Sequence, residues 1–401
     1  MSNTQKKNVP ELRFPGFEGE WEEKKLGEFC EFNNGINAKK EQYGMGRKFI
    51  NVLDILNNNF ITYENIIGKV SVPENVEKNN KVEFGDLVFL RSSETREDVG
   101  LCNVYLDKNY ALYGGFIIRG KKVSDYNPIF LKEALNIPKK RYEIGSAAGG
   151  STRFNVSQDI LRKINVKFPP IEEQQKIGDL FSKLDRQIEL EEQKLELLQQ
   201  QKKGYMQKIF SQELRFKDEN GNDYPIWSNE RLGEVTTVTM GQSPKSVNYT
   251  DNSNDMVLIQ GNADIENGLI NPRIYTREVT KLIQKDEIIL TVRAPVGKLA
   301  MAQINACIGR GVCSIKGDKF LYYFLEWFAT QNKWIRFSQG STFESISGND
   351  IRNIHIKIPV EDERTKIIKL LNSLDVLNSK TDLKIQNLKQ RKQSLLQKIF
   401  V

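Results

Sequence analysis

The sequence predicts an α+β protein: two tandem mixed, β-rich domains separated by two long helices that form an antiparallel coiled coil. The first observation is an internal repeat, in which residues 169–210 align without a gap on residues 359–400, with 15 of 42 positions identical. The second is that a strand-rich region precedes each copy. The third is an apolar spacing of 3 and 4 within the repeat, typical of a helix. A period of roughly 200 residues is too long for a solenoid repeat.

These observations divide the chain into four segments. The domains are expected at residues 1–168 and 211–358, and the helices at residues 169–210 and 359–401. Within the domains, strands are predicted at 86–91, 164–168, 286–293 and 354–358, and short helices at 128–135 and 320–328. The offset between matching positions falls from 206 to 190 along the domains. The first domain therefore has 16 additional residues, spread over loops, where recognition commonly resides.

Each repeated segment is predicted to be a helix of about 40 residues, roughly 60 Å long. Acidic residues lie in each first turn, where the helix dipole favours them. One apolar stripe, with Lys202 and Lys392 among its interruptions, runs along both helices: Phe181, Leu184, Ile188, Leu195, Leu198 and Ile209 in the first, and Leu371, Leu374, Ile385, Leu388, Leu395 and Ile399 in the second. Because both copies keep the same stripe, we expect them to pair within one chain, with coiling between chains as the alternative.

Composition limits the class of protein. The net charge is +7, which is weak support for a nucleic-acid partner. Four cysteines without a CxxC spacing and a single histidine argue against a metal site or a disulfide framework. The N-terminus lacks the apolar stretch of a signal peptide, and no apolar run is long enough to cross a membrane. We therefore expect a cytoplasmic protein that binds no membrane and no metal.

Several loops have the side chains that read DNA. Arg, Lys, Asn and Gln pair with guanine and adenine edges, and Ser and Thr hold phosphates. The candidates are Asn34, Lys39, Lys40, Arg91, Arg96, Ser151 and Arg153 in the first domain, and Gln242, Lys245, Gln260, Arg293, Arg310 and Ser341 in the second. Arg91 and Arg293 are expected at the ends of corresponding strands. Taken singly, such residues are also ordinary turn residues.

Catalytic patterns are incomplete. The glycine spacing at residues 145–152 is that of a phosphate-binding loop, but Ser151 stands where the essential lysine belongs. Asn127-Pro-Ile-Phe130 is similar to an element of amino-methyltransferases, yet its third residue differs and no glycine-rich cofactor loop follows a strand upstream. We expect it to begin a helix. No Gly-x-Ser-x-Gly motif occurs. The chain is predicted to recognise a ligand rather than to catalyse a reaction.

The whole chain resembles the specificity subunits of type I restriction–modification systems. The resemblance lies in residues 10–28 (Pro-Glu-Leu-Arg-Phe-Pro-Gly-Phe, then Glu-Trp and Lys-Leu-Gly-Glu), in residues 168–177 (Phe-Pro-Pro-Ile-Glu-Glu-Gln-Gln-Lys-Ile) and in the repeated Gln-Lys-Ile-Phe. It implies two target-recognition domains, each reading one half of a split sequence in double-stranded DNA. It also implies two helices that hold the domains apart.

The same resemblance implies partner proteins and leaves alternatives. Two modification (methyltransferase) subunits would carry S-adenosylmethionine and the adenine-N6 chemistry. Two restriction subunits would carry ATP, Mg²⁺, translocation and cleavage, so this chain is expected to bind no cofactor itself. The alternatives are a self-contained DNA methyltransferase or nuclease, and a coiled-coil scaffold that does not read DNA.

Overall fold

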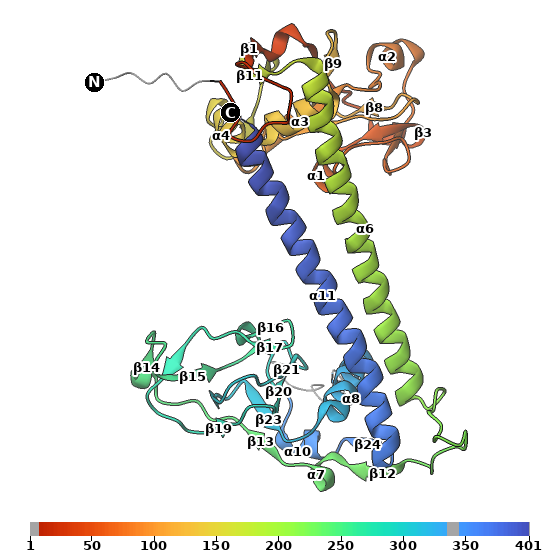
Figure 1. Ribbon diagram of the computed structural model, residues 1–401, viewed down its shortest axis with the longest axis vertical. Helices are drawn as coiled ribbons and strands as arrows, with labels where there is room; N and C mark the ends of the chain where they lie inside the picture. The colour runs from red at the N-terminus through yellow and green to blue at the C-terminus, as the bar shows by residue number, and fades with distance from the viewer. Residues whose placement is uncertain (1–7, 335–344, 401) are drawn as a thin grey trace. The chain divides into compact units, whose positions relative to one another are not determined.

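The computed structural model describes residues 8–334 and 345–400, which form two compact units. Residues 1–192 and 383–401 make up the first unit, and residues 193–382 the second. Each unit holds one mixed domain together with half of each long helix (Figure 1). The fold class predicted from the sequence is confirmed, including the predicted strands and both short helices.

The first domain is built from short elements. Its strands are β1 (Glu22–Lys25), β2 (Cys30–Asn34), β3 (Tyr43–Ile50), β4 (Lys69–Val70), β5 (Leu87–Leu90), β6 (Ser92–Ser93), β7 (Cys102–Val104), β8 (Leu112–Tyr113), β9 (Ile117–Lys122), β10 (Phe154–Asn155) and β11 (Asn165–Phe168). Its helices are η1 (Leu26–Glu28), η2 (Lys40–Gln42), α1 (Val52–Asn57), α2 (Glu74–Asn79), α3 (Pro128–Asn136), α4 (Pro138–Ala147) and α5 (Gln158–Lys163).

The second domain repeats this plan. Its strands are β12 (Ser228–Arg231), β13 (Val238–Met240), β14 (Tyr249–Thr250), β15 (Met256–Ile259), β16 (Ile265–Glu266), β17 (Leu269–Ile270), β18 (Tyr275–Thr276), β19 (Leu282–Ile283), β20 (Ile288–Thr291), β21 (Leu299–Met301), β22 (Ala306–Ile308), β23 (Val312–Ile315) and β24 (His355–Ile358). Its helices are α7 (Leu232–Val235), η3 (Ser246–Asn248), η4 (Asn262–Asp264), α8 (Lys319–Thr330) and α10 (Gly348–Arg352).

A four-stranded antiparallel sheet forms the centre of each domain. Its order is β2-β9-β5-β7 in the first and β13-β23-β20-β21 in the second. A parallel strand pair lies beside it, β3 with β8 and β15 with β22. The first and last strands of each domain also pair, β1 with β11 and β12 with β24. Each domain is therefore closed on itself before the long helix begins.

The long helices are α6 (Ile171–Phe210) and α11 (Glu361–Ile399). In the first unit the start of α6 runs antiparallel to the end of α11, because Asp185 and Glu191 contact Lys392 and Lys384 respectively. Leu184, Ile188, Leu388 and Leu395 form an apolar cluster between the two helices. In the second unit the end of α6 and the start of α11 pack into one core with α8.

The predicted apolar stripe serves two purposes. Of its twelve residues nine are buried, and Leu195, Leu198 and Leu395 are half-buried. Phe181 and Ile399 belong to the core of the first unit, and Leu371 belongs to the core of the second. The stripe is therefore a helix–helix seam that continues at its ends into the domain cores. The last turns carry this docking, because Phe400 contacts Phe130 at 5.4 Å between ring centres.

Asn127 confirms the prediction that its motif begins a helix. Its side chain accepts a hydrogen bond from Phe130 N at 2.9 Å and so caps α3. Its backbone N and its side-chain amide donate to Gln174 and Gln175 on α6. This close approach requires a glycine at Gly178, where a Cβ atom would lie 2.3 Å from the Asn127 oxygen. Glycine is unfavourable in a helix interior, and the close packing of Asn127 explains why α6 has a glycine at position 178.

Candidate nucleic-acid interface

Three loops meet at one edge of the first domain, and we call this the first loop edge: residues 34–36 after β2, residues 50–51 after β3 and residues 113–116 between β8 and β9. Gly114 N donates a hydrogen bond to Ile50 O at 3.1 Å. Gly35 must be a glycine, because a Cβ atom there would lie 2.1 Å from Gly114 O. The polar side chain that the first loop contributes is Asn34, which is exposed.

The second loop edge is built in the same way from residues 240–243, 259–261 and 308–311. Gly309 N donates to Ile259 O at 2.7 Å, and a Cβ atom at Gly241 would lie 2.2 Å from Gly309 O. Each loop contributes one of the predicted candidates, which are Gln242, Gln260 and Arg310. The structure thus brings these three residues to one edge, and the exposed Arg310 adds a positive charge there.

Arg91 and Arg293 lie beyond the ends of corresponding strands, β5 and β20, but they are not equivalent positions. The backbone of Arg91 donates to the loop before β9 at 2.8 Å and accepts from Val156 N at 3.0 Å. Val292 makes the equivalent pair of hydrogen bonds in the second domain, also at 2.8 and 3.0 Å. Arg293 therefore matches Ser92, one residue further along. Its side chain is exposed, whereas that of Arg91 is half-buried.

The remaining candidates are distributed over other loops. Arg96 donates to Gly145 O at 3.1 Å and stacks on Phe154, and Arg153 lies 3.6 Å from Glu94. Lys39, Lys40, Ser151 and Lys245 are exposed. Ser341 lies outside the described residues. The structure gathers Asn34 and Arg91 in one pocket of about 440 Å³ and brings Gln242, Gln260 and Arg310 to one edge.

Both domains are held to the long helices by a repeated arginine–glutamate pair. Arg13 donates twice to the buried Glu173, with both bonds at 2.8 Å. Arg215 donates in the same way to the buried Glu363, at 2.9 and 2.6 Å. Trp227 adds a third bond to Glu363, at 2.8 Å. Charge-assisted bidentate bonds of this kind fix orientation as well as adding energy.

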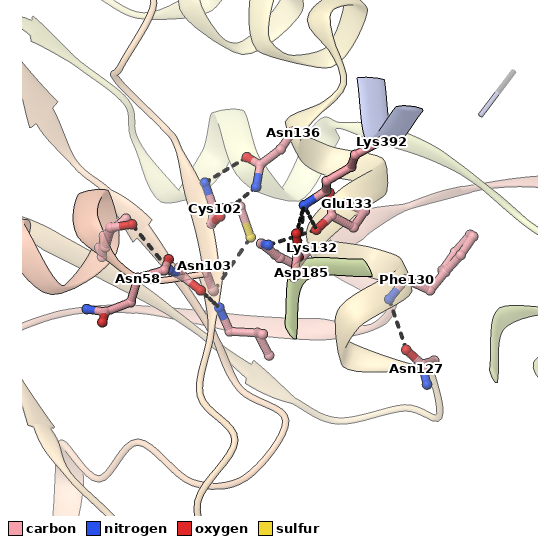
Figure 2. Close-up of polar contacts among 12 residues, drawn as sticks. Asn58, Cys102, Asn103, Asn127, Phe130, Lys132, Glu133, Asn136, Asp185 and Lys392 are labelled. Atoms are coloured by element: carbon pink, nitrogen blue, oxygen red, sulfur yellow. Dashed lines mark hydrogen bonds and ion pairs between the residues drawn. The ribbon is translucent and has the colours of Figure 1, made fainter. Parts of the chain in front are cut away.

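A buried group of charges, the first ion cluster, joins the first domain to both helices (Figure 2). The ammonium group of Lys392 on α11 lies 2.7 Å from Asp185 on α6 and 3.2 Å from Glu133 on α3. Lys132 lies 2.8 Å from the same glutamate. Burial alone would raise the pKa of Glu133, but the ammonium groups of Lys132 and Lys392 hold that pKa below its ordinary value. The cluster contains two cations and two anions.

The second ion cluster occupies the matching place in the second unit. Lys202 on α6 lies 2.7 Å from Asp375 on α11 and 2.7 Å from Glu326 on α8. Burial raises the pKa of Glu326, and the nearby carboxylate of Asp375 adds to the shift, against the opposing effect of Lys202. This cluster contains one cation and two anions. In the sequence Lys202 and Lys392 interrupt an apolar stripe. They occupy the same position in the two copies of the repeat, as do Asp185 and Asp375, and this repetition was the signal that these lysines bind aspartates.

Metal sites and membrane spans are not found in the part of the chain that the structure describes. No group of three or more His, Cys, Asp or Glu side chains could hold a metal ion among those residues. No helix within the same ranges is long and apolar enough to cross a membrane.

Comparison with known proteins agrees with a DNA-recognition protein. The model of the type I restriction modification DNA specificity domain matches twice, at residues 18–200 and 217–390. A putative type I restriction enzyme MjaX specificity subunit from Methanocaldococcus jannaschii is 26% identical over 381 residues, which cover 89% of this chain and 87% of the relative. A type I restriction enzyme MjaVIII specificity subunit from the same organism is 23% identical over 394 residues, which cover 92% of this chain and 89% of the relative.

Solved structures share the fold. The crystal structure of a type I restriction–modification S subunit from M. genitalium matches with a TM-score of 0.64 at 16% identity, over 98% of this chain and 99% of that one. A chain from a study of type I restriction–modification complex assembly matches with a TM-score of 0.59 at 21% identity, over 97% and 98% of the two chains.

The duplicated domain defines the class of protein: the DNA-recognition component of a restriction–modification system. The chain belongs to the type I restriction modification DNA specificity family, as the resemblance in its sequence indicated. It is a specificity subunit with two DNA-recognition domains, and this reading is supported over the two alternatives considered from the sequence.

Proposed function

We propose that each domain reads one half of a split DNA sequence and that the first and second loop edges are the reading surfaces. The observation that carries the proposal is a common backbone frame with different side chains. Equivalent hydrogen bonds hold the loops of both edges. Where the second domain has Gln242 and Arg310, however, the first has Ile36 and Gly115. Two similar frames with different polar groups suit a target with two different halves.

The proposal extends to the assembly. Two modification subunits and two restriction subunits would bind this chain, and they would carry S-adenosylmethionine, ATP and Mg²⁺. The chain itself would be non-catalytic and would act in the cytoplasm, where the DNA that it reads is found. The resemblance to specificity subunits supports these statements. Purified chain incubated with S-adenosylmethionine and DNA is expected to transfer no methyl group, and methyl transfer by the chain alone would contradict this part.

A domain exchange tests the reading of half-sites. Residues 22–168 begin with β1 and end with β11, so exchanging them for the matching segment of another family member keeps that strand pair together. The donor segment should retain Phe130 and Glu133, which contact the long helices. Methylated adenines mapped in cells that make the whole complex should then change in one half of the recognised sequence only.

The reciprocal exchange of residues 228–358, from β12 to β24, is the matched control. It should change the other half and leave the first half intact. An exchange that rewrote both halves, or neither, would contradict the proposal.

A further inference from the structure

One pocket beside the first loop edge has three polar side chains that are replaced at the matching positions of the second domain. It has a volume of about 440 Å³ and is lined by Asn34 from β2, Arg91 from the end of β5, Asn155 from β10, and Gln158 and Arg162 from α5. We call it the Arg91 pocket. A volume of this size is within the range of pockets that bind small ligands.

Charges within the pocket leave one guanidinium group available. Arg162 is neutralised by Asp159 at 2.7 Å and donates to Gln158 at 3.1 Å. Arg91 forms no ion pair with any carboxylate among the described residues, and the one hydrogen bond of its side chain to protein is from Nη1 to Gly115 O at 3.2 Å. That bond fixes the direction of the half-buried guanidinium group. The pocket therefore offers a positioned arginine without a carboxylate partner.

Equivalent positions in the second domain have different chemistry. The helix caps Ser157 and Ser347 align α5 with α10, so Gln158 corresponds to Gly348. Met240, which corresponds to Asn34, lies over that glycine, because a Cβ atom at Gly348 would be 3.0 Å from the Met240 side chain.

The arginine is also absent at the matching position of the second domain. Arg91 corresponds to Val292, which is 2% exposed and belongs to the core. In the second domain the arginine of the loop edge is Arg310, on a different loop. Three polar side chains of the pocket, Asn34, Arg91 and Gln158, are thus replaced by Met240, Val292 and Gly348 on the same backbone frame.

We propose that the Arg91 pocket reads the edge of one base in the half-site of the first domain and that it is a determinant of specificity for that half only. A guanidinium group with adjacent amides matches the acceptor-rich edge of guanine, with Arg91 donating to O6 and N7. Arginine and asparagine also contact phosphates, but a phosphate contact would carry no base preference, and the test below separates the two. The inference rests on the proposed function, in that the domain must read DNA.

The test replaces two polar residues of the pocket by their counterparts. Asn34→Met with Arg91→Val introduces the residues that the second domain carries at these positions. The complex of the full chain with its modification subunits selects sites from a library of random duplexes. We expect base preference to fall about 5- to 150-fold at one or two positions of one half-site, the range for a bidentate base contact. The other half-site and the dependence of affinity on salt are expected to stay unchanged.

Two further variants keep the result interpretable. Arg91→Lys preserves the charge but not the forked geometry, so it should lose the same preference. If the double variant does not fold, Arg91→Lys decides alone, and retained preference would then overturn the proposal. Arg186→Ala removes an exposed arginine outside the Arg91 pocket and should leave every preference intact.

Other outcomes separate the inference from the proposed function. Weaker binding to all sequences alike, with a salt slope reduced by about 1, would show a phosphate contact and overturn the inference. Unchanged preference in both Arg91 variants would overturn it as well. A wild-type complex that selected no split sequence would overturn the proposed function instead.

Discussion

Neutralising Glu133 and Glu326 should have unequal effects, because their two ion clusters carry different charge balances. In the first ion cluster two ammonium groups face two carboxylates, and Glu133 is 3% exposed. Glu133→Gln leaves the ammonium group of Lys132 buried without a carboxylate partner, and breaking a buried ion pair in this way costs about 3–5 kcal/mol. In the second ion cluster one ammonium group faces two carboxylates, so Glu326→Gln removes an excess negative charge.

The magnitude for Glu326 is small. Its side chain is 34% exposed, so solvent screens much of the interaction. The glutamine can still accept a hydrogen bond from Lys202. We therefore expect Glu326→Gln to change the free energy of unfolding of the second unit by less than about 1 kcal/mol in either direction.

Glu326 and Glu133 contribute to the pH dependence of stability with opposite signs. The pKa of Glu326 is raised in the folded state, so its contribution is fully present below the ordinary pKa of 4.5 and is lost as the pH rises through the raised pKa. The pKa of Glu133 is lowered, so its contribution is present above 4.5 and is lost as the pH falls through the lowered pKa.

Hydrogen–deuterium exchange in urea checks this, because it reports the opening free energy of each unit separately. Measured from pH 4.5 to 7.5, the stability of the second unit in Glu326→Gln should lack the part of the pH dependence that Glu326 contributes in the wild type, and the first unit should be unchanged. Equal destabilisation by Glu133→Gln and Glu326→Gln at pH 7.5, or an unchanged pH profile of the second unit in Glu326→Gln, would refute the charge-balance argument.

Two further predictions concern the long helices. A heptad inserted after Gln199 and another after Lys389 preserve the apolar seam and lengthen the helix pair by about 10 Å. The unread gap between the two half-sites in the methylation map should therefore grow by about three base pairs. Full methylation at sites with the original gap would show that the helices do not set the gap. Gly178→Ala should destabilise the first unit by about 1–3 kcal/mol, because its Cβ atom would clash with the Asn127 cap. Gly204→Ala, where nothing lies within 4 Å, should instead stabilise its helix by about 0.5–1 kcal/mol in urea unfolding, and equal effects of the two changes would contradict this packing argument.

Local patterns were sufficient to predict the two long helices, the short helices α3 and α8 and the strands β5, β11, β20 and β24, but not the other short elements or the arrangement of strands. The spacing of apolar residues located α6 and α11, because helix periodicity is set by near neighbours. The order β2-β9-β5-β7 depends on pairing between residues far apart in the chain, which no local pattern specifies.

Local sequence patterns were also insufficient to predict which residues meet at the candidate site. Arg91 and Arg293 were predicted at the ends of corresponding strands and do lie there, after β5 and β20, but a strand end does not specify which residues are equivalent. The hydrogen bonds show that Val292 is the true counterpart, and a shift of one residue in a strand moves a side chain to the other face. The Arg91 pocket could not be found from sequence, because its residues come from four elements separated by more than 120 positions.

The residues that both copies keep and those that they change have different tasks. Glu173 and Glu363 are buried and each binds an arginine, while Lys202 and the partly buried Lys392 each bind carboxylate groups. A buried charge that loses its partner is costly, so these positions resist change in either copy. At the loop edges the polar side chains of Asn34, Gln242 and Arg310 are exposed, so they can change at little cost in stability. A duplicated frame of this kind allows each domain to acquire its own base preference while its attachment to α6 and α11 stays the same.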